Sequence, residues 1–383
     1  MENKLKLMTI VGTRPEIIRL SEIIKKCDKY FDHILVHTGQ NYDYSLNEVF
    51  FEDLNLNKPS FYLEVNSDSL GNTIGNIISK SYNLIKELNP DALLILGDTN
   101  SCLSAIASKR LHIPVFHLEA GNRCFDECLP EETNRRIVDH IADVNLCYTE
   151  NARRYLLMEG RPKDRTFVVG SPMREVLDKN IDKIKSSNIV NELGLENKNY
   201  FLLSAHREEN IDNEDNFYSL FDAINEIAVK YNTKVIYSMH PRAKKFIEQR
   251  NYKFDDRIIK HIPLSFSDYN CLQFNAKCVI SDSGTLPEES DYYSSVGLNF
   301  PAVSLRTSTE RPEAIENGRF ILSGIDKNSI LQAIDIALNL NNDKVYGAEV
   351  RDYSYNNVSD KVVKIIQSFT PYINRYVWRK NLG

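Results

Sequence analysis

Two continuous apolar runs in the first half of the chain each lead into a carboxylate. Residues 92–96 read ALLIL and are followed, after one glycine, by Asp98, and residues 113–118 read IPVFHL and are followed by Glu119. Runs of this kind are typical of strands in a parallel sheet that is covered on both faces. Ligands of such sheets bind beyond the carboxyl ends of the strands. The sequence therefore predicts that Asp98 and Glu119 face one crevice.

Two further acids, Glu131 and Glu132, stand in the segment PEETNRR, which begins soon after Glu119. Several acids in one cleft can have pKa values that are pushed apart, so that one acts as a base while another acts as an acid. We expect such a group of acids to move protons. Glu132 and Arg136 are expected on a solvated helix face and are left out of the catalytic set.

Strand-like and helix-like segments alternate through the whole chain, which predicts an α/β protein with two doubly wound, Rossmann-like domains. A length of 383 residues also suits two cores better than one. In the first half, strands are expected near residues 5–11, 33–37, 92–97, 114–118, 145–148 and 166–169, and in the second half in the segments YFLLSAH, TKVIYSMH, AKCVISDSG and FPAVSLR.

Turn residues mark the expected boundary between the domains, at Gly170, Ser171 and Pro172. We expect an N-terminal domain over residues 1–171, which carries the acids, and a C-terminal domain over residues 172–365. Residues 366–383 contain the only tryptophan of the chain in an aromatic and basic pattern, so we expect a helix there that packs back on the N-terminal domain.

The composition is that of a globular protein of the cytoplasm, with 42% hydrophobic and 26% charged residues. No apolar stretch approaches the ~20 residues that span a bilayer, and the N-terminus has no signal-peptide pattern. The net charge of −6 gives no reason to expect a nucleic-acid partner. Seven scattered cysteines favour reduced thiols over a disulfide framework. Cys124 and Cys128 are four residues apart, which is weak support for a metal or redox site.

Two strand-to-helix junctions have the residues of an anion site. Gly12 gives a tight turn and Pro15 opens a helix, so Arg14 stands where a helix N-terminus meets the crevice. Ser283 and Gly284 stand at a similar junction in the second half. Each junction alone is equally well explained as an ordinary turn of a doubly wound fold. Basic residues accompany both, namely Arg19 in the first half and Arg306 and Arg311 in the second, which favours a diphosphate. The chain has neither GxGxxG nor GxxxxGK[ST], so a dinucleotide and a P-loop nucleotide are disfavoured.

Three histidines are candidates for the site. His206 closes a strand and precedes the polar residues REEN, so a ligand or catalytic role is about as well supported as a structural one. His117 points to the same strand face as Glu119, and we expect it to support that residue. His240 ends another strand and is expected to support the ligand site of the second domain. No two histidines have the spacing HxxxH of a metal site.

Seven motifs occur in one order from Gly12 to Glu313, namely GTRPE, ILGDT, HLEAG, PEE..NR, HRxEN, SDSG with EE after it, and RTSTERPE. In this order they resemble the non-hydrolysing UDP-N-acetylglucosamine 2-epimerase family. The resemblance implies the glycosyltransferase-B architecture, with the active site in the cleft between two Rossmann-like domains, and a homodimer. The loop AGNRCFDECLPEETNRRIVDH resembles the branch that makes UDP-N-acetyl-L-fucosamine from UDP-2-acetamido-2,6-dideoxy-L-talose for capsule and O-antigen synthesis.

The resemblance also implies a mechanism, in which UDP leaves C1, C2 loses its proton, and re-addition of UDP with protonation on the opposite face inverts C2. It implies no cofactor and no metal. Asp98, Glu119 and Glu131 are then the acid-base set, and His206 and Arg14 stabilise the leaving diphosphate. Ser283 and Gly284 bind phosphate and Glu289 binds the ribose, while Arg135 and Arg311 are cations of the site; Arg19, His240, Thr285 and Arg306 complete the expected substrate-binding set.

Three positions depart from the pattern of the N-acetylglucosamine enzymes. Arg19 stands in place of a lysine, Ala205 in place of a glycine before the histidine, and Thr285 in place of a second glycine. These changes concern the nucleotide more than proton transfer. The alternatives are a UDP-N-acetylglucosamine 2-epimerase, a glycosyltransferase of the same architecture, which would not need the three acids, and a silent sugar-nucleotide-binding regulator, which would have lost them.

Overall fold

The structure is a computed structural model that describes residues 4–39, 49–65, 68–343 and 347–380. The chain forms two compact units, which are described one at a time. Unit 1 comprises residues 1–178 and 352–383, and unit 2 comprises residues 179–351. No helix in the described ranges is both long and apolar enough to cross a membrane.

Unit 1 contains a parallel sheet with the strand order β3-β2-β1-β4-β5-β6-β7. The chain builds the sheet outward from β1 in one direction and then from β4 in the other, so the doubly wound fold predicted from the sequence is confirmed. The strands are β1 Lys6–Val11, β2 Asp32–His37, β3 Phe61–Tyr62, β4 Ala92–Leu96, β5 Val115–Leu118, β6 Val144–Cys147 and β7 Thr166–Val168.

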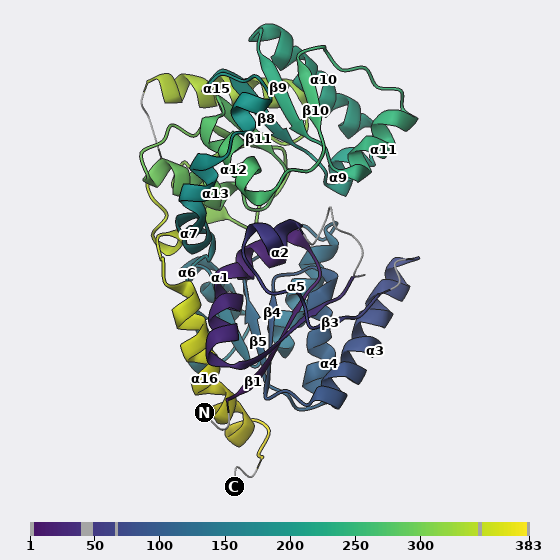
Figure 1. Ribbon diagram of the computed structural model, residues 1–383, viewed down its shortest axis with the longest axis vertical. Helices are drawn as coiled ribbons and strands as arrows, with labels where there is room; N and C mark the ends of the chain where they lie inside the picture. The colour runs from purple at the N-terminus through teal and green to yellow at the C-terminus, as the bar shows by residue number, and fades with distance from the viewer. Residues whose placement is uncertain (1–3, 40–48, 66–67, 344–346, 381–383) are drawn as a thin grey trace. The chain divides into compact units, whose positions relative to one another are not determined.

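Helices connect these strands and cover the sheet. Apolar residues of β1, β4 and β5 pack against α3 and α4 in one continuous core. Helix α1 packs against α16, which returns from the C-terminal end of the chain (Figure 1). The helices of unit 1 are α1 Arg14–Tyr30, α2 Val49–Asp53, α3 Leu70–Leu88, α4 Ser104–Arg110, α5 Pro130–Ile141, α6 Glu150–Met158 and α16 Val358–Tyr376, with the 3-10 turns η2 Asn100–Leu103 and η3 Lys163–Arg165. Helix α7 Met173–Ser186 begins in unit 1 and ends in unit 2.

Unit 2 repeats the scheme with the order β10-β9-β8-β11-β12-β13, again all parallel. Its strands are β8 Tyr200–Ser204, β9 Lys234–Ser238, β10 Ile258–His261, β11 Cys278–Ser281, β12 Ala302–Ser304 and β13 Ile321–Leu322. Its helices are α8 Ile189–Glu192, α9 Glu208–Ile211, α10 Glu214–Lys230, α11 Pro241–Gln249, α12 Phe266–Asn275, α13 Leu286–Ser295, α14 Pro312–Glu316 and α15 Lys327–Asn342, and η4 Arg351–Tyr353 is a 3-10 turn.

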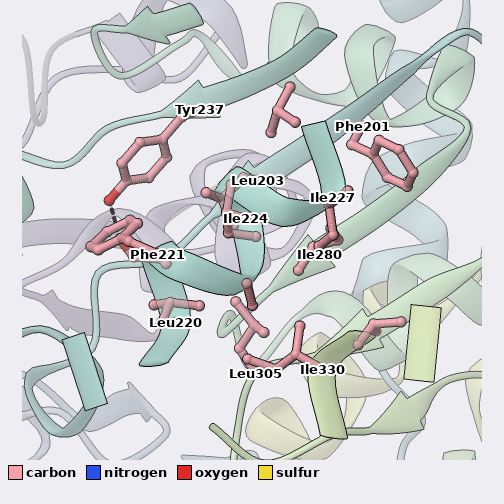
Figure 2. Packing of buried hydrophobic residues seen from close by; sticks show 14 of the residues in the cluster. Phe201, Leu203, Leu220, Phe221, Ile224, Ile227, Tyr237, Ile280, Leu305 and Ile330 are labelled. Carbon is pink, nitrogen blue, oxygen red and sulfur yellow. Dashed lines mark hydrogen bonds between the residues drawn. The ribbon is translucent and has the colours of Figure 1, made fainter. Parts of the chain in front are cut away.

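Helix α10 supplies the largest part of the unit 2 core. Its residues Leu220, Phe221, Ile224 and Ile227 have the spacing i, i+1, i+4 and i+7, so they lie on one face and pack against the central strands (Figure 2). Tyr237 is also buried there, and its hydroxyl donates to the carbonyl of Ala205 at 2.9 Å, which satisfies the one polar atom of that side chain.

The division of the chain lies at 178/179 and 351/352, whereas the sequence predicts boundaries at 171/172 and 365/366. The first boundary lies within helix α7. The turn residues that predict the boundary lie a few residues before it, ahead of that helix. At the second boundary the chain re-enters unit 1 at residue 352, before α16 begins.

Candidate functional site

In unit 1, strands β1 and β4 are neighbours in the sheet. The chain adds strands on one side of β1 and then on the other side of β4, so the order of the strands reverses between them. Glu16 fixes the turn between β1 and α1, because its Oε2 accepts from the backbone N–H of Gly12 at 3.1 Å and from the hydroxyls of Thr13 at 2.8 Å and Thr99 at 3.0 Å. Ser101 donates to the other oxygen. Burial raises the pKa of Glu16 and outweighs these hydrogen bonds. The turns after β1 and β4 are therefore tied to one buried carboxyl group.

Arg14 and Arg19 lie on helix α1, which starts at this turn. Arg14 is the first residue of the helix, and its guanidinium carbon lies 5.5 Å from the ring centroid of Phe50. Arg19 is buried, and its Nη1 binds the carboxylate of Glu119. The structure thus places Arg19, which we expected at the substrate, in contact with one of the expected catalytic acids.

Glu119 has an unusual backbone conformation. Its φ of 68° is left-handed, which is uncommon for a residue with a side chain and costs energy. Its carboxylate is buried, and Oε1 accepts from Nδ2 of Asn122 at 3.2 Å. Gly97, at the end of the adjacent strand β4, also has a left-handed φ of 70°, and a Cβ there would lie 3.5 Å from Oε2 of Glu119. An acidic residue with a strained backbone at a strand end is typical of a functional site.

Asp98 is bound by an arginine from helix α5. Arg135 donates to Oδ2 of Asp98 through Nε, at 3.0 Å, and through Nη2. Its Nη1 donates to Oε2 of Glu132 at 2.9 Å, so one guanidinium joins two carboxylates. Asn134 adds a hydrogen bond of 2.9 Å to the carbonyl of Asp98. The strand ends therefore carry two carboxylates, each with its own arginine.

The expectation that Glu132 lies on a solvated face is wrong. Glu132 is fully buried and accepts from Arg135, from Nη2 of Arg136 at 3.0 Å, and from the backbone N–H of Cys124 at 3.3 Å. The arginine side chains compensate for the burial of the carboxylate and lower its pKa, although burial by itself would raise it. Arg136 is partly exposed, so only this half of the pair lies toward solvent.

Glu131 lies beside Glu132 in the first turn of α5 and is half-buried. The preceding loop, residues 122–129, is anchored to the same helix because the Cys124 thiol lies 3.2 Å from Oε2 of Glu132. Phe125 extends from this loop with a left-handed φ of 57°, and its ring is 61% exposed and packs edge-on against Tyr155. The loop thus combines an anchored thiol with an exposed aromatic ring.

In unit 2, the strand ends of β8 and β11 are joined by Asp282, a residue that the sequence reasoning missed. Its Oδ2 accepts from the backbone N–H groups of His206 at 2.8 Å and Arg207 at 2.9 Å and from Nδ2 of Asn210 at 3.0 Å. Nδ1 of His206 lies 3.1 Å from Oδ1. Burial by itself would raise the pKa of Asp282, but His206 and Arg207 outweigh it and lower the pKa. Asp282 therefore orients His206.

Ser283, Thr285 and Glu289 form a chain of hydrogen bonds at the start of α13. The hydroxyls of Ser283 and Thr285 are 2.9 Å apart, and Thr285 donates to Oε1 of Glu289 at 2.9 Å. Nε2 of Gln273 donates to Oε2 at 2.9 Å. Thr285 has a φ of −90°, which any residue adopts, so the threonine in place of glycine adds a hydroxyl without backbone strain.

Gly284 lies next to a buried ion pair. A Cβ at this position would be 3.0 Å from Oε1 of Glu310, whose other oxygen lies 2.8 Å from Nη2 of Arg306. Arg311 is also buried, and its Nη2 lies 3.4 Å from Oε2 of Glu288. Both arginines that we expected at the phosphates thus contact glutamates of their own unit.

His240 is the N-cap of helix α11, where its Nδ1 accepts from the backbone N–H of Arg242 at 3.2 Å. Its ring centroid is 5.6 Å from that of His206, so the two histidines expected in unit 2 lie side by side.

The sequence and the fold are similar to those of known proteins. The sequence model of the family described as UDP-N-acetylglucosamine 2-epimerase matches residues 25–367. The structure of UDP-N-acetylglucosamine 2-epimerase from Rickettsia bellii is similar with a TM-score of 0.90 and 45% identity, covering 99% of this chain and 100% of that chain. The Methanocaldococcus jannaschii UDP-GlcNAc 2-epimerase in complex with UDP-GlcNAc and UDP has a TM-score of 0.88 and 33% identity, covering 95% of this chain and 100% of that chain.

A further relative extends the range of sugars in these comparisons. The UDP-2,3-diacetamido-2,3-dideoxy-D-glucuronate 2-epimerase of Pseudomonas aeruginosa is 30% identical over 340 residues, which is 87% of this chain and 92% of the relative. The resemblance inferred from the seven motifs is confirmed at the level of the family. The chain belongs to the non-hydrolysing UDP-N-acetylglucosamine 2-epimerase family and is an isomerase that acts on a UDP sugar.

Proposed function

We propose that the protein inverts C2 of its UDP sugar by elimination and re-addition of UDP through a 2-acetamidoglycal. The C2 hydrogen of an acetamido sugar is not acidic, so direct deprotonation is too costly. Cleavage of the C1–O bond to UDP builds positive charge at C1, a base removes the C2 proton, and the C1=C2 double bond forms. UDP then returns to C1 while a proton enters C2 from the opposite face. UDP takes the bonding electrons as it leaves and gives them back on re-addition, so the sequence needs no external redox partner.

The observation that carries this proposal is the pair of carboxylates on adjacent strand ends, each bound by a separate arginine. Asp98 follows β4 and contacts Arg135, while Glu119 follows β5 and contacts Arg19. Two faces of C2 need at least two proton-transfer groups. Asp98 and Glu119 supply two such groups, and Glu131, in the first turn of α5, supplies the third.

Unit 2 binds the nucleotide in this proposal. Gly284 offers its backbone N–H group to a phosphate before the start of α13, and the N–H of Ser283, which donates to the hydroxyl of Ser281 at 3.0 Å, turns to the phosphate when the nucleotide binds. His206 contacts the carboxylate of Asp282 and is placed to stabilise the leaving diphosphate, and Arg14 assists. Glu289 is held by Thr285 and Gln273 in an orientation suited to the ribose hydroxyls. His240, Arg306 and Arg311 complete this set as supporting groups.

The substrate that we propose is UDP-2-acetamido-2,6-dideoxy-L-talose, which C2 inversion converts to UDP-N-acetyl-L-fucosamine for capsule or O-antigen synthesis. The loop of residues 122–129 supports it, because this is the segment that resembles the fucosamine branch and because Phe125 offers an apolar ring suited to the 6-methyl group. The second candidate is UDP-N-acetylglucosamine, which is favoured by the names of the relatives from R. bellii and M. jannaschii. The resemblance further supports a homodimer in the cytoplasm without cofactor.

The initial rates on the two sugars at equal concentration decide between them. We expect faster turnover of the L-talose sugar, because a pocket shaped for a methyl group discriminates against a hydroxymethyl group by about 10- to 200-fold. The variant Phe125→Ala should reduce this ratio, whereas Phe61→Ala, which truncates an exposed ring on the edge strand β3, should not. Faster epimerisation of UDP-N-acetylglucosamine by the unmodified protein would assign the second activity.

A further inference from the structure

A buried polar network lies directly beneath the strand ends of β4 and β5, and the proposed mechanism does not use it. Its members are His117 on β5, Asp139 on α5 and Arg123 in the loop after β5, and each side chain is at most 1% exposed. We call these three residues the Asp139 network. Fully buried ionisable groups are costly unless they are paired, so their pairing indicates what they do.

His117 bridges two oxygen atoms. Its Nδ1 lies 2.9 Å from Oδ1 of Asp139, and its Nε2 lies 2.8 Å from the carbonyl oxygen of Gly97. A carbonyl oxygen can only accept, and an ionised carboxylate can only accept, so the ring donates at both nitrogens. Donation at both nitrogens would make the imidazole a cation, whose positive charge Asp139 would balance. Burial by itself would raise the pKa of Asp139, but His117 and Arg123 outweigh it and lower the pKa.

Asp139 also binds the chain just after Glu119. Its two oxygens lie 3.2 and 3.1 Å from the backbone N–H of Gly121, and Oδ2 accepts from Nη1 of Arg123 at 2.6 Å. The same Nη1 donates to the carbonyl of Asn122 at 2.7 Å, and Glu159 accepts from Nε and Nη2 of Arg123 at 2.9 and 2.6 Å. The Asp139 carboxylate thus contacts two segments. It contacts the residue before Asp98 through His117, and it contacts residues after Glu119 directly.

The segments that the network contacts include three residues with left-handed backbone conformations. Gly97, Glu119 and Gly121 have φ values of 70°, 68° and 81°. Glycine adopts this conformation freely, but for Glu119 it costs energy and persists only where the surrounding structure determines it. Gly121 has no room for a side chain either, since a Cβ would lie 2.3 Å from the carbonyl oxygen of Ala152.

We propose that Asp139 and His117 are positioning residues that set the separation and orientation of the Asp98 and Glu119 carboxylates. This inference rests on the proposed function, because it assumes that these two carboxylates transfer the protons. Neither positioning residue is assigned a contact with the sugar. They act by holding the peptide of Gly97 and the turn at Glu119 in one arrangement.

The variant Asp139→Asn tests the proposal. An asparagine presents an N–H group where His117, Gly121 and Arg123 all donate, so at least one of these contacts is lost. We expect kcat to fall by about 10- to 100-fold, since a displacement near 1 Å is enough for such a loss. The KM for the UDP sugar should change less than ~3-fold, because the nucleotide is bound by unit 2.

Asp143→Asn is the matched control. Asp143 is also buried, and it binds the start of β5, the end of that strand opposite to Glu119. Its Oδ2 accepts from the backbone N–H of Val115 at 3.0 Å, and its Oδ1 contacts Lys109. Its substitution should lower the melting temperature as Asp139→Asn does but leave kcat within ~2-fold at a temperature where both variants are folded. An equal fall of kcat in both variants would reduce the role of Asp139 to stability and overturn the proposal.

A double-mutant cycle separates action through Glu119 from independent effects. If Asp139 works through that carboxylate, Asp139→Asn should add less than ~3-fold to the loss caused by Glu119→Gln. Fully multiplicative losses would contradict the proposal. If Asp139→Asn does not fold, His117→Gln, which keeps an amide donor but cannot bridge both oxygens as a cation, replaces it in the same cycle.

A second measurement is independent of activity. In ¹⁵N-histidine-labelled protein at pH 7.5, the His117 signals, assigned by their loss in His117→Gln, should show both ring nitrogens protonated. A ring with one bare nitrogen would refute the bridging geometry. If the unmodified protein epimerises neither UDP sugar, the proposed function fails, and this spectrum still decides whether His117 bridges Asp139 and Gly97.

Discussion

Arg135 binds Asp98 through two nitrogens, Nε at 3.0 Å and Nη2, while its third nitrogen binds Glu132 at 2.9 Å. The planar fork of one guanidinium thus fixes a strand-end carboxylate relative to helix α5. A lysine has a single charged nitrogen on a flexible stem and cannot make the three contacts with this geometry. We predict that Arg135→Lys lowers kcat by about 10- to 100-fold. Steady-state kinetics would measure this effect.

Arg136→Lys is the control for that substitution, because Arg136 is the next residue of the same helix and is partly exposed. Its contact with Glu127 lies on the surface, and a lysine keeps the positive charge beside Glu132, so kcat should stay within ~2-fold. Equal losses in the two variants would show that any change on this face of α5 impairs the enzyme, and the specific role of Arg135 would be lost.

Substitution of the acids should lower turnover without weakening UDP binding, unlike substitution of the nucleotide-binding residues. We predict that Asp98→Asn, Glu119→Gln and Glu131→Gln each lower turnover by at least ~100-fold, the scale of general acid-base catalysis. Calorimetric titration with UDP should give an affinity close to that of the unmodified protein, because these side chains are assigned to C2. Near-normal turnover of Glu119→Gln would remove this residue from the reaction.

In unit 2, Asp282→Asn should weaken UDP binding. The substitution removes the charge that faces His206, and asparagine keeps only one of the two acceptor oxygens that face His206 and the peptide N–H groups of His206 and Arg207. We expect the Kd for UDP to rise by about 10-fold or more, as for the loss of a hydrogen bond to a charged group. Asp335→Asn, on the exposed side of the same unit beside Lys230, should leave the Kd unchanged. An unchanged Kd in Asp282→Asn would mean that the His206 turn does not bind the nucleotide.

Much of the fold could be predicted from the sequence because the central strands are buried on both faces. The strands β4, β5, β8 and β11 are continuous apolar runs. Such runs predict a parallel sheet, and ligands of a parallel sheet bind beyond the carboxyl ends of its strands. The short edge strands β3, β10 and β13 carry no such run and were not predicted. Their hydrogen bonds to β2, β9 and β12 depend on the finished sheet rather than on local pattern.

The candidate site was less predictable, because burial decides the state of a charged residue. Glu132, Arg135 and Asp139 are spaced by three and four positions on α5, which places them on one helix face. That spacing was the available signal, and Glu132 was nevertheless expected in solvent because a charge on a helix usually is. The role of Asp282 was not predicted, because the serine and glycine beside it in the motif SDSG indicated a phosphate-binding turn. The contact of Arg19 with Glu119, a hundred residues apart, has no local signal.

His37, at the end of β2, should make stability depend on pH. Burial lowers its pKa to about 4, from about 6.5 in an unfolded chain. Between these values the unfolded state binds a proton that the folded state does not, so the free energy of unfolding falls as the pH drops from 6.5 towards 4. The expected loss is on the order of 2–3 kcal/mol.

Urea unfolding of His37→Gln should show a flatter pH profile in that range, because glutamine does not titrate and still offers an acceptor to the backbone N–H of Gly39. His261→Gln, a partly exposed position of unit 2, should keep the profile of the unmodified protein. Identical slopes in the two variants would assign the pH dependence to other groups.

The most direct test of the account is a proton NMR spectrum of the epimerisation in D₂O. If carboxylates remove and return the C2 proton on different faces, solvent deuterium must enter C2 of the product, while C3 and C4 keep their protons. We predict loss of the C2 proton signal at the rate of product formation, with free UDP and glycal only as minor species. A product that retains its C2 proton would contradict the proposed proton transfer by Asp98, Glu119 and Glu131.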